Sequence, residues 1–194
     1  YDQLTLSGEY TIEAWVAPAN VTQEGPARIA SYSGGEDARN FMLGQSMYNY
    51  DFLNRNDTSD ANGEPALSTA DADERLQATL QHVVVTYSPT AGRRIYVNGE
   101  HTGDLDPANG SGLSAWNNSF ALVLGSEVDG SNPFRGVVRL LAIHKTALSD
   151  TDSADNFNAG VGERFFLLFN ISHLVDASQG YVLFEGRQFD RYSY

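Results

Sequence analysis

A long polar segment, residues 55–75, carries many of the side chains in this sequence that could do chemistry. It reads RNDTSDANGEPALSTADADER and holds almost no bulky apolar residues. Calcium takes six to eight hard oxygens from carboxylates, amides and carbonyls on such loops. The segment, with one further turn, therefore predicts a calcium site, although Asp and Asn also occupy turns simply to hydrogen bond the local backbone. The candidate ligands are Asp57, Asp60, Asn62, Asp71, Asp73 and Asp129.

Paired carboxylates would allow a different chemistry, glycoside cleavage. A retaining glycosidase needs an acid and a nucleophile about 5 Å apart on one face. The closest match is Asp71-Ala72-Asp73-Glu74, which lies in the polar segment, so no apolar surroundings would keep a general acid protonated. No Ser/His/Asp grouping and no glycine-rich phosphate loop is legible. We therefore predict that the protein is not an enzyme and keep a glucanase-type hydrolase as the third alternative.

Aromatic side chains beside polar ones could bind a sugar. Trp116 is the best candidate platform, because it lies in a polar loop with no apolar neighbours in sequence to bury it. Tyr48 and Tyr50 alternate with Phe52 on one face of an expected strand, and the alternative is that this face is core. The candidate ligand-binding residues are Trp116, Tyr48, Tyr50, Asn54, Arg55 and Asn117.

Composition limits the classes of partner. The formal net charge is −13, from 12 basic and 25 acidic residues, which excludes nucleic acid because little could neutralise the phosphates. No run reaches the roughly 18 apolar residues of a membrane span. The four histidines are scattered, which makes a zinc site unexpected, and there are no cysteines. An acidic surface fits a salty extracellular or periplasmic setting. Tyr1 is not a start methionine, so we expect a mature or excised fragment.

The elements that must position these residues are strands. Residues 81–103, QHVVVTYSPTAGRRIYVNGEHTG, alternate β-branched and aromatic residues around two turns. Asn98-Gly99 predicts a tight hairpin, because a type I′ turn needs positive φ at both positions. Further strands are expected at 11–18, 28–33, 40–45, 48–54, 66–69, 120–126, 134–144, 165–171 and 181–185. Ser149 predicts the start of one short helix, which Asn158-Ala159-Gly160 would end.

Four segments in order resemble bacterial laminin-G-like domains, which belong with legume lectins and pentraxins among the jelly-roll sandwiches. They read YTIEAWV, RNFMLGQ, HVVVTYSPTAGRRIYVNGE and LGS…NPFRGVVRLLAIHKTALSD. The resemblance implies an all-β antiparallel sandwich over residues 1–160, with 161–194 as a C-terminal extension. Two departures weaken the family's calcium site: Val137, Val138 and Arg139 follow the Phe-x-Gly turn where relatives carry an acid, and the opening strand is reduced to Tyr1–Leu6.

The resemblance also implies a function. We expect a non-catalytic, extracytoplasmic recognition module, part of a larger bacterial protein, that binds a glycan or a protein and takes calcium for stability. The alternative is an accessory subunit docked in a membrane-associated complex. The apolar run Phe165–Phe169 and the aromatic C-terminus favour that alternative, because they need another surface to cover them.

Overall fold

The computed structural model describes residues 1–161 of the chain. Residues Tyr1–Asn158 form one structural unit. The predicted extension lies outside the described residues from position 162 onward, and so do the strands expected at 165–171 and 181–185. The elements are α1 (Asp2–Ser7), β1 (Tyr10–Pro18), β2 (Ala27–Gly35), β3 (Ala38–Ser46), β4 (Asn49–Asn54), β5 (Leu67–Ser68), a 3-10 turn (Asp71–Asp73), β6 (Gln81–Ser88), β7 (Gly92–Val97), β8 (Glu100–Leu105), β9 (Ala121–Leu124), β10 (Gly136–His144) and α2 (Asp150–Ala159).

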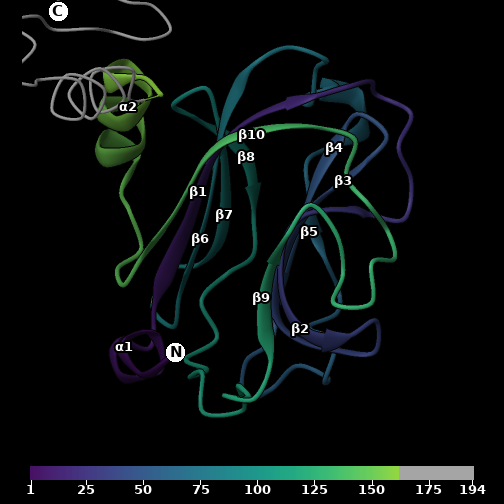
Figure 1. The fold of residues 1–194 in the computed structure, drawn as a ribbon. Coiled ribbons are helices and arrows are strands. Elements are labelled where there is room, and N and C mark those ends of the chain that lie inside the picture. Colours follow the sequence, from purple (N-terminus) through teal and green to yellow (C-terminus); the bar gives the residue numbers. More distant parts are fainter. Residues whose placement is uncertain (162–194) are drawn as a thin grey trace, which may run out of the picture. The chain divides into compact units, whose positions relative to one another are not determined.

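The strands form two antiparallel sheets that face each other (Figure 1). Sheet A has the order β10-β1-β6-β7-β8, and sheet B has the order β5-β4-β3-β2-β9. This confirms the predicted antiparallel sandwich of jelly-roll type. The strand positions expected between residues 11 and 144 are also confirmed, with ends displaced by a few residues.

The core lies between the sheets and follows the alternation in the sequence. Ile12, Ala14 and Val16 of β1 are fully buried, and they face side chains from sheet B such as Phe41 and Phe52. Full burial of one such apolar side chain contributes about 1.5–3 kcal/mol, so this double layer supplies most of the favourable free energy of folding. No disulfide supports it, because the chain has no cysteine.

The outer face of sheet A is covered as well, which the alternation does not predict. Trp15 stacks on Phe157 of α2 with ring centroids 5.7 Å apart, and the Asn156 amide donates to Glu13 at 2.9 Å. The residues of β1 expected on a solvent face are therefore buried. The predicted helix start is confirmed, because the Ser149 hydroxyl accepts from the Asp152 amide at 3.1 Å. No helix within residues 1–161 is long and apolar enough to cross a membrane.

The first residues differ from the expectation. Tyr1–Leu6 was expected as a reduced opening strand, but residues Asp2–Ser7 form helix α1. Gly8 ends this helix in the left-handed conformation at φ 76° and donates its amide to the Leu4 carbonyl. Leu4 is buried in the core, so one apolar contact holds the short helix against the end of the sandwich.

The same end of the sandwich gathers the polar loops. Tyr10 at the start of β1 is paired with Tyr87 near the end of β6, and β7 begins close by at Gly92. The loops that follow β4 and β8 open at this end, whereas the Asn98-Gly99 hairpin closes the other. Asn98 and Gly99 have φ of 52° and 82°, as the predicted type I′ turn requires.

Candidate functional site

A cavity of about 300 Å³ lies at this end, between the loops after β4 and β8. Tyr87, Gly92 and two prolines form its less polar parts. Its polar lining residues are Asn54, Asn56, Thr58, Ser59, Glu64, Arg93, Asp106 and Asn109. This volume falls at the lower end of the range for small-molecule sites, and amides and hydroxyls dominate the polar lining.

Asn54, the last residue of β4, has the least satisfied side chain in this lining. It is 2% exposed, and its Oδ1 accepts a hydrogen bond from the Tyr10 hydroxyl at 2.7 Å. Its buried Nδ2 has no hydrogen-bond partner among residues 1–161. Leaving a buried donor unpaired costs about 1–3 kcal/mol, and most native donors are paired. A ligand acceptor that reached this nitrogen would remove the cost.

Arg93, at the start of β7, donates hydrogen bonds to three segments around the cavity. Its Nε donates to Asp106 Oδ2 at 2.7 Å, and two further nitrogens donate to the Phe52 and Pro65 carbonyls at 2.8 Å each. The guanidinium also lies 5.9 Å from the centre of the Phe52 ring. Arg93 therefore joins β4, the loop after it and the loop after β8.

Two polar loops form the rim, and both were predicted as loops from their composition. Asp57 Oδ1 accepts from the Ser114 hydroxyl at 2.9 Å and from the Ala115 amide at 2.8 Å. The Ser111 hydroxyl donates to Asn56 Oδ1 at 3.1 Å. These bonds connect residues more than fifty positions apart, so they fix the shape of the rim.

The prediction that Trp116 is exposed is wrong. Its sequence context predicted exposure, but its side chain is only 4% exposed. Its ring packs edge-on against Tyr10 with centroids 5.1 Å apart, and its Nε1 donates to the Arg55 carbonyl at 2.7 Å. The loop folds back and closes the end of the core with Trp116. The apolar neighbours that bury it come from β1, β2 and β3, far away in sequence.

Of the six predicted ligand-binding residues, Asn54 alone lines the cavity. Tyr50 is fully buried and donates its hydroxyl to Gln81 Oε1 at 3.0 Å, so the core alternative describes it. Tyr48 is half-buried at the opposite end of β4. Asn117 is exposed on the cavity's end of the sandwich, where its backbone bonds the Asn40 side chain. Asn54 therefore lines the cavity, and Arg55, Trp116 and Asn117 lie together near it through bonds to one another and to Asn40. Tyr48 and Tyr50 are not part of this group.

The predicted calcium ligands do not converge. Asp60 and Asp129 accept from backbone amides of their own turns, at 2.9 Å each. Asp71 accepts from Asn49, Asp73 pairs with Arg75, and Asn62 accepts from Arg39. Within residues 1–161, no three His, Cys, Asp or Glu side chains gather as a metal site requires. These six residues do not fit one calcium ion in this arrangement.

His82 and His144, which lie far apart in the sequence, both contact the carboxylate of Glu13. The spacing of the histidines in the sequence did not indicate this. His82 Nε2 lies 3.0 Å from Glu13 Oε1, and His144 Nε2 lies 2.8 Å from Glu13 Oε2. Burial alone would raise the pKa of Glu13, but the hydrogen bonds from His82 and His144 outweigh it and lower that pKa. Each histidine bonds a different carboxylate oxygen, under helix α2, so the group fastens β6 and β10 to β1. His173 lies outside the described residues.

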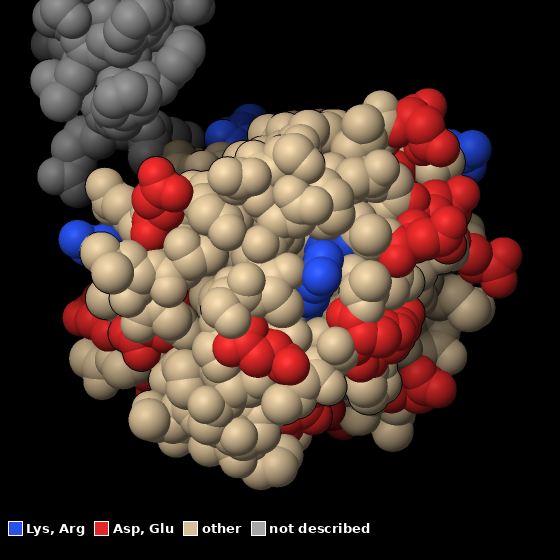
Figure 2. Space-filling view, turned by 90° about the horizontal axis from the view of Figure 1, so that it is seen from below, with Lys and Arg blue, Asp and Glu red and all other residues tan. Residues whose placement is uncertain are grey.

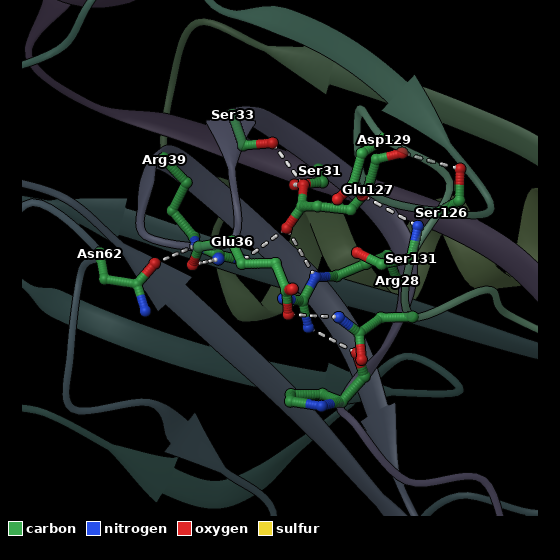
Figure 3. A network of polar contacts seen from close by, with 12 residues as sticks. Arg28, Ser31, Ser33, Glu36, Arg39, Asn62, Ser126, Glu127, Asp129 and Ser131 are labelled. Carbon is green, nitrogen blue, oxygen red and sulfur yellow. Dashed lines mark hydrogen bonds and ion pairs between the residues drawn. The ribbon is translucent and has the colours of Figure 1, made fainter.

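A second polar cluster, also missed, lies on the outer face of sheet B and is centred on Glu127. Figure 3 shows its carboxylate among Arg28, Ser31, Ser33 and Arg39. Glu127 is 2.9 Å from Arg28 Nε and 3.2 Å from Arg39, and it accepts from both serines. Burial alone would raise the pKa of Glu127, but hydrogen bonds from Ser31, Ser33 and Arg28 hold it below its ordinary value. Glu127 is only 1% exposed, so this Glu127 network is enclosed.

A family profile described as the concanavalin A-like lectin/glucanases superfamily matches residues 2–152. A search of curated proteins finds no match. Among solved structures, the CBM40 domain of Ruminococcus gnavus IT-sialidase bound to α2,3-sialyllactose has a TM-score of 0.62 at 16% identity. That match covers 79% of this chain and 85% of that one.

Botulinum neurotoxin domains also match. The binding domain of neurotoxin DC, solved with rat synaptotagmin II, has a TM-score of 0.55 at 14% identity, with coverage of 80% of this chain and 36% of that one. A neurotoxin type C structure, whose cell entry depends on two ganglioside molecules, has the same TM-score and identity and coverage of 78% and 36%. This chain therefore spans about a third of those toxin structures.

At these identities the solved structures show a shared fold. The profile covers most of the chain, and the two facing sheets agree with it. The chain is a lectin-like jelly-roll domain whose structural neighbours include domains solved with a glycan or a protein bound. It belongs to the concanavalin A-like lectin/glucanases superfamily.

Proposed function

We propose that this chain is a non-catalytic recognition module that binds a glycan in the cavity at the end of the sandwich. The observation that carries the proposal is a cavity lined by amide and hydroxyl side chains, among them Asn54, whose buried Nδ2 has no hydrogen-bond partner among residues 1–161. A sugar hydroxyl, ring oxygen or N-acetyl carbonyl can accept from that donor. Hydroxyls can also donate to the carboxylates and carbonyls around it.

The carboxylates of the cavity do not form a hydrolytic pair. Asp106 is bound to Arg93, and Glu64 is exposed and accepts from the Ala66 amide at 3.1 Å. A general acid needs apolar surroundings that keep it protonated, and a nucleophile needs its partner on the opposite side of the bond. Neither Glu64 nor Asp106 lies in such surroundings, which supports a binding module over a glucanase.

A glycan suits this site better than a protein surface does. Standard protein interfaces bury about 1,600 Å² over broad patches, whereas this cavity is small and recessed. The domain solved with sialyllactose supports the same choice, since this chain covers 85% of it. The accessory-subunit alternative depended on residues 165–169, which lie outside the described residues.

Two parts of the proposal concern the surroundings of the module. A location outside the cytoplasm is supported by the net charge of −13. Calcium stays a prediction from composition, and a binding assay with and without a chelator tests it. Loss of glycan binding on chelation would support a bound ion.

The experiment is a glycan array probed with the wild-type chain, Asn54→Ala and Asn109→Ala. Both changes remove an amide from the cavity, and Asn109 is exposed, so its loss should leave the fold intact. We expect Asn54→Ala to weaken binding of the array hits at least tenfold, about 1.4 kcal/mol. The matched control is Asn49→Ala at the far end of the same strand. Hits bound equally by all four proteins would refute this cavity as the site.

A further inference from the structure

The charges of the cavity indicate which glycans it takes. Its lining contains one cationic side chain, Arg93, and two carboxylates, Glu64 and Asp106. A cavity that recognises an acidic sugar usually offers an arginine whose fork is free to bind a carboxylate or sulfate. The question is therefore whether Arg93 is free.

Arg93 is already bound. Asp106 neutralises its charge, with Nε at 2.7 Å from Oδ2, and the Phe52 and Pro65 carbonyls bind the remaining two nitrogens. The side chain is 10% exposed. An anion that bound the guanidinium would compete with Asp106, and displacing Asp106 would leave that carboxylate without its partner.

The surroundings oppose an anion further. Figure 2 shows the end of the molecule that carries α1, where acidic side chains are spread over the face and the basic atoms near its centre are recessed. The net charge of the whole chain is −13. A negatively charged surface weakens the binding of an anionic ligand and slows its association. By contrast, the hydroxyls of an uncharged sugar can donate to the carboxylates of the lining and pair with its amide side chains.

We infer that the cavity selects uncharged saccharides and rejects sialylated, uronic or sulfated ones. The inference rests on the proposed glycan function of the same cavity. It also separates this chain from the CBM40 domain that was solved with sialyllactose, although the two share a fold. In this chain, Asp106 and two carbonyls occupy the arginine fork that an acidic sugar would need.

The test measures affinity for neutral oligosaccharides and for their sialylated and sulfated derivatives, chosen as matched pairs from the neutral array hits. We expect each acidic derivative to bind at least tenfold more weakly than its neutral parent. Raising the salt concentration should reduce this difference in affinity for the wild-type chain, because screening weakens the repulsion between like charges. This arm needs no variant and so does not depend on folding of a mutant.

Asp106→Asn supplies the second arm, with Asp37→Asn as the matched control for a charge lost from an exposed site outside the cavity. Asp106→Asn should raise the affinity for an acidic derivative several-fold relative to the affinity for its neutral parent. Asp37→Asn should leave this ratio of affinities unchanged. Acidic derivatives that bind more tightly than their neutral parents, or binding that salt weakens, would overturn the inference and leave the glycan function standing. Glycan binding unchanged in Asn54→Ala would instead overturn the proposed site itself.

Discussion

The cavity and the Glu127 network both hold arginine, carboxylate and hydroxyl groups, but they use them differently. In the network, Glu127 is enclosed by Arg28, Arg39 and two serines, and its side chain is completely buried. In the cavity, Arg93 is satisfied, yet the Nδ2 of Asn54 has no partner among residues 1–161. In the network, even Arg39 Nη1, which makes no hydrogen bond, is 3.2 Å from the Glu127 carboxylate, whereas the unpartnered amide nitrogen of Asn54 belongs to a residue that lines a cavity.

This difference separates a structural polar cluster from a candidate site. Buried charges that satisfy one another mark a structural role, because breaking the set exposes a large desolvation cost. An unpaired donor beside a cavity marks a place where a ligand can lower the free energy. Residue types alone do not distinguish the two regions, since each holds arginine, carboxylate and serine side chains.

The largest effect should come from Glu127→Ala. It would leave Arg28 and Arg39 buried without their counterion, so we expect a loss of about 3–5 kcal/mol in the free energy of unfolding. Urea denaturation measures it, with Glu24→Ala as an exposed control. The fraction that folds should still bind the array hits as the wild-type chain does. A loss below about 1 kcal/mol would show that the network does not hold the sheet.

Asn54→Ala should have the reverse profile. Its binding loss, at least tenfold, should exceed its effect on stability. Removing the side chain costs the Tyr10 hydrogen bond but also removes a buried unpaired donor, so we expect a net change of about 1 kcal/mol or less. Thermal melts measure the change in stability, and calorimetric titrations measure the loss of glycan affinity. A variant that unfolds as readily as Glu127→Ala would contradict the contrast between the regions.

Acid should weaken the Glu127 network. The pKa of Glu127 is lowered in the folded chain, so the unfolded chain binds the proton more readily as the pH falls. The stability that this group contributes is complete above its unfolded pKa, about 4.5, and is lost as the pH falls through the lower folded pKa. Urea midpoints between pH 7 and pH 3 measure this loss. It should be smaller than that of Glu127→Ala, because protonation leaves the side chain in place.

Asp57→Asn should give the smallest effect. The exposed bonds of Asp57 to Ser114 and Ala115 join the two rim loops, and such bonds contribute about 0.5–1 kcal/mol. We expect a stability change near that size and a weakening of glycan binding of less than tenfold. A larger loss of affinity would show that Asp57 contacts the ligand directly. Calorimetric titration with one array hit settles the point.

The sequence predicts local features of this fold well. The Asn98-Gly99 turn, the Ser149 helix start and the alternation in β1 and β6 each depend on residues within a few positions of one another. The four family segments also indicated the correct family and the antiparallel sandwich. These signals are short-range or carried by an ordered pattern, and both can be read without coordinates.

The site could be predicted only in part, because it depends on pairings across the chain. Trp116 has polar neighbours in sequence and aromatic neighbours in space, so its burial could not be read locally. Arg93 bonds to Asp106, which follows the neighbouring strand of the same sheet, and to Pro65, which precedes a strand of the other sheet. No spacing of residues in the sequence indicates these two contacts. Asn54 was named as a candidate, but its unpaired Nδ2 could be found only once its neighbours were placed.

The most direct test of the glycan proposal is a crystal structure of the chain with the tightest neutral hit from the array. The proposal predicts sugar density in the cavity, with a sugar oxygen within about 3 Å of Asn54 Nδ2, Arg93 still bound to Asp106, and the Glu127 network unchanged. A sugar bound elsewhere on the sandwich, with the cavity empty, would contradict it.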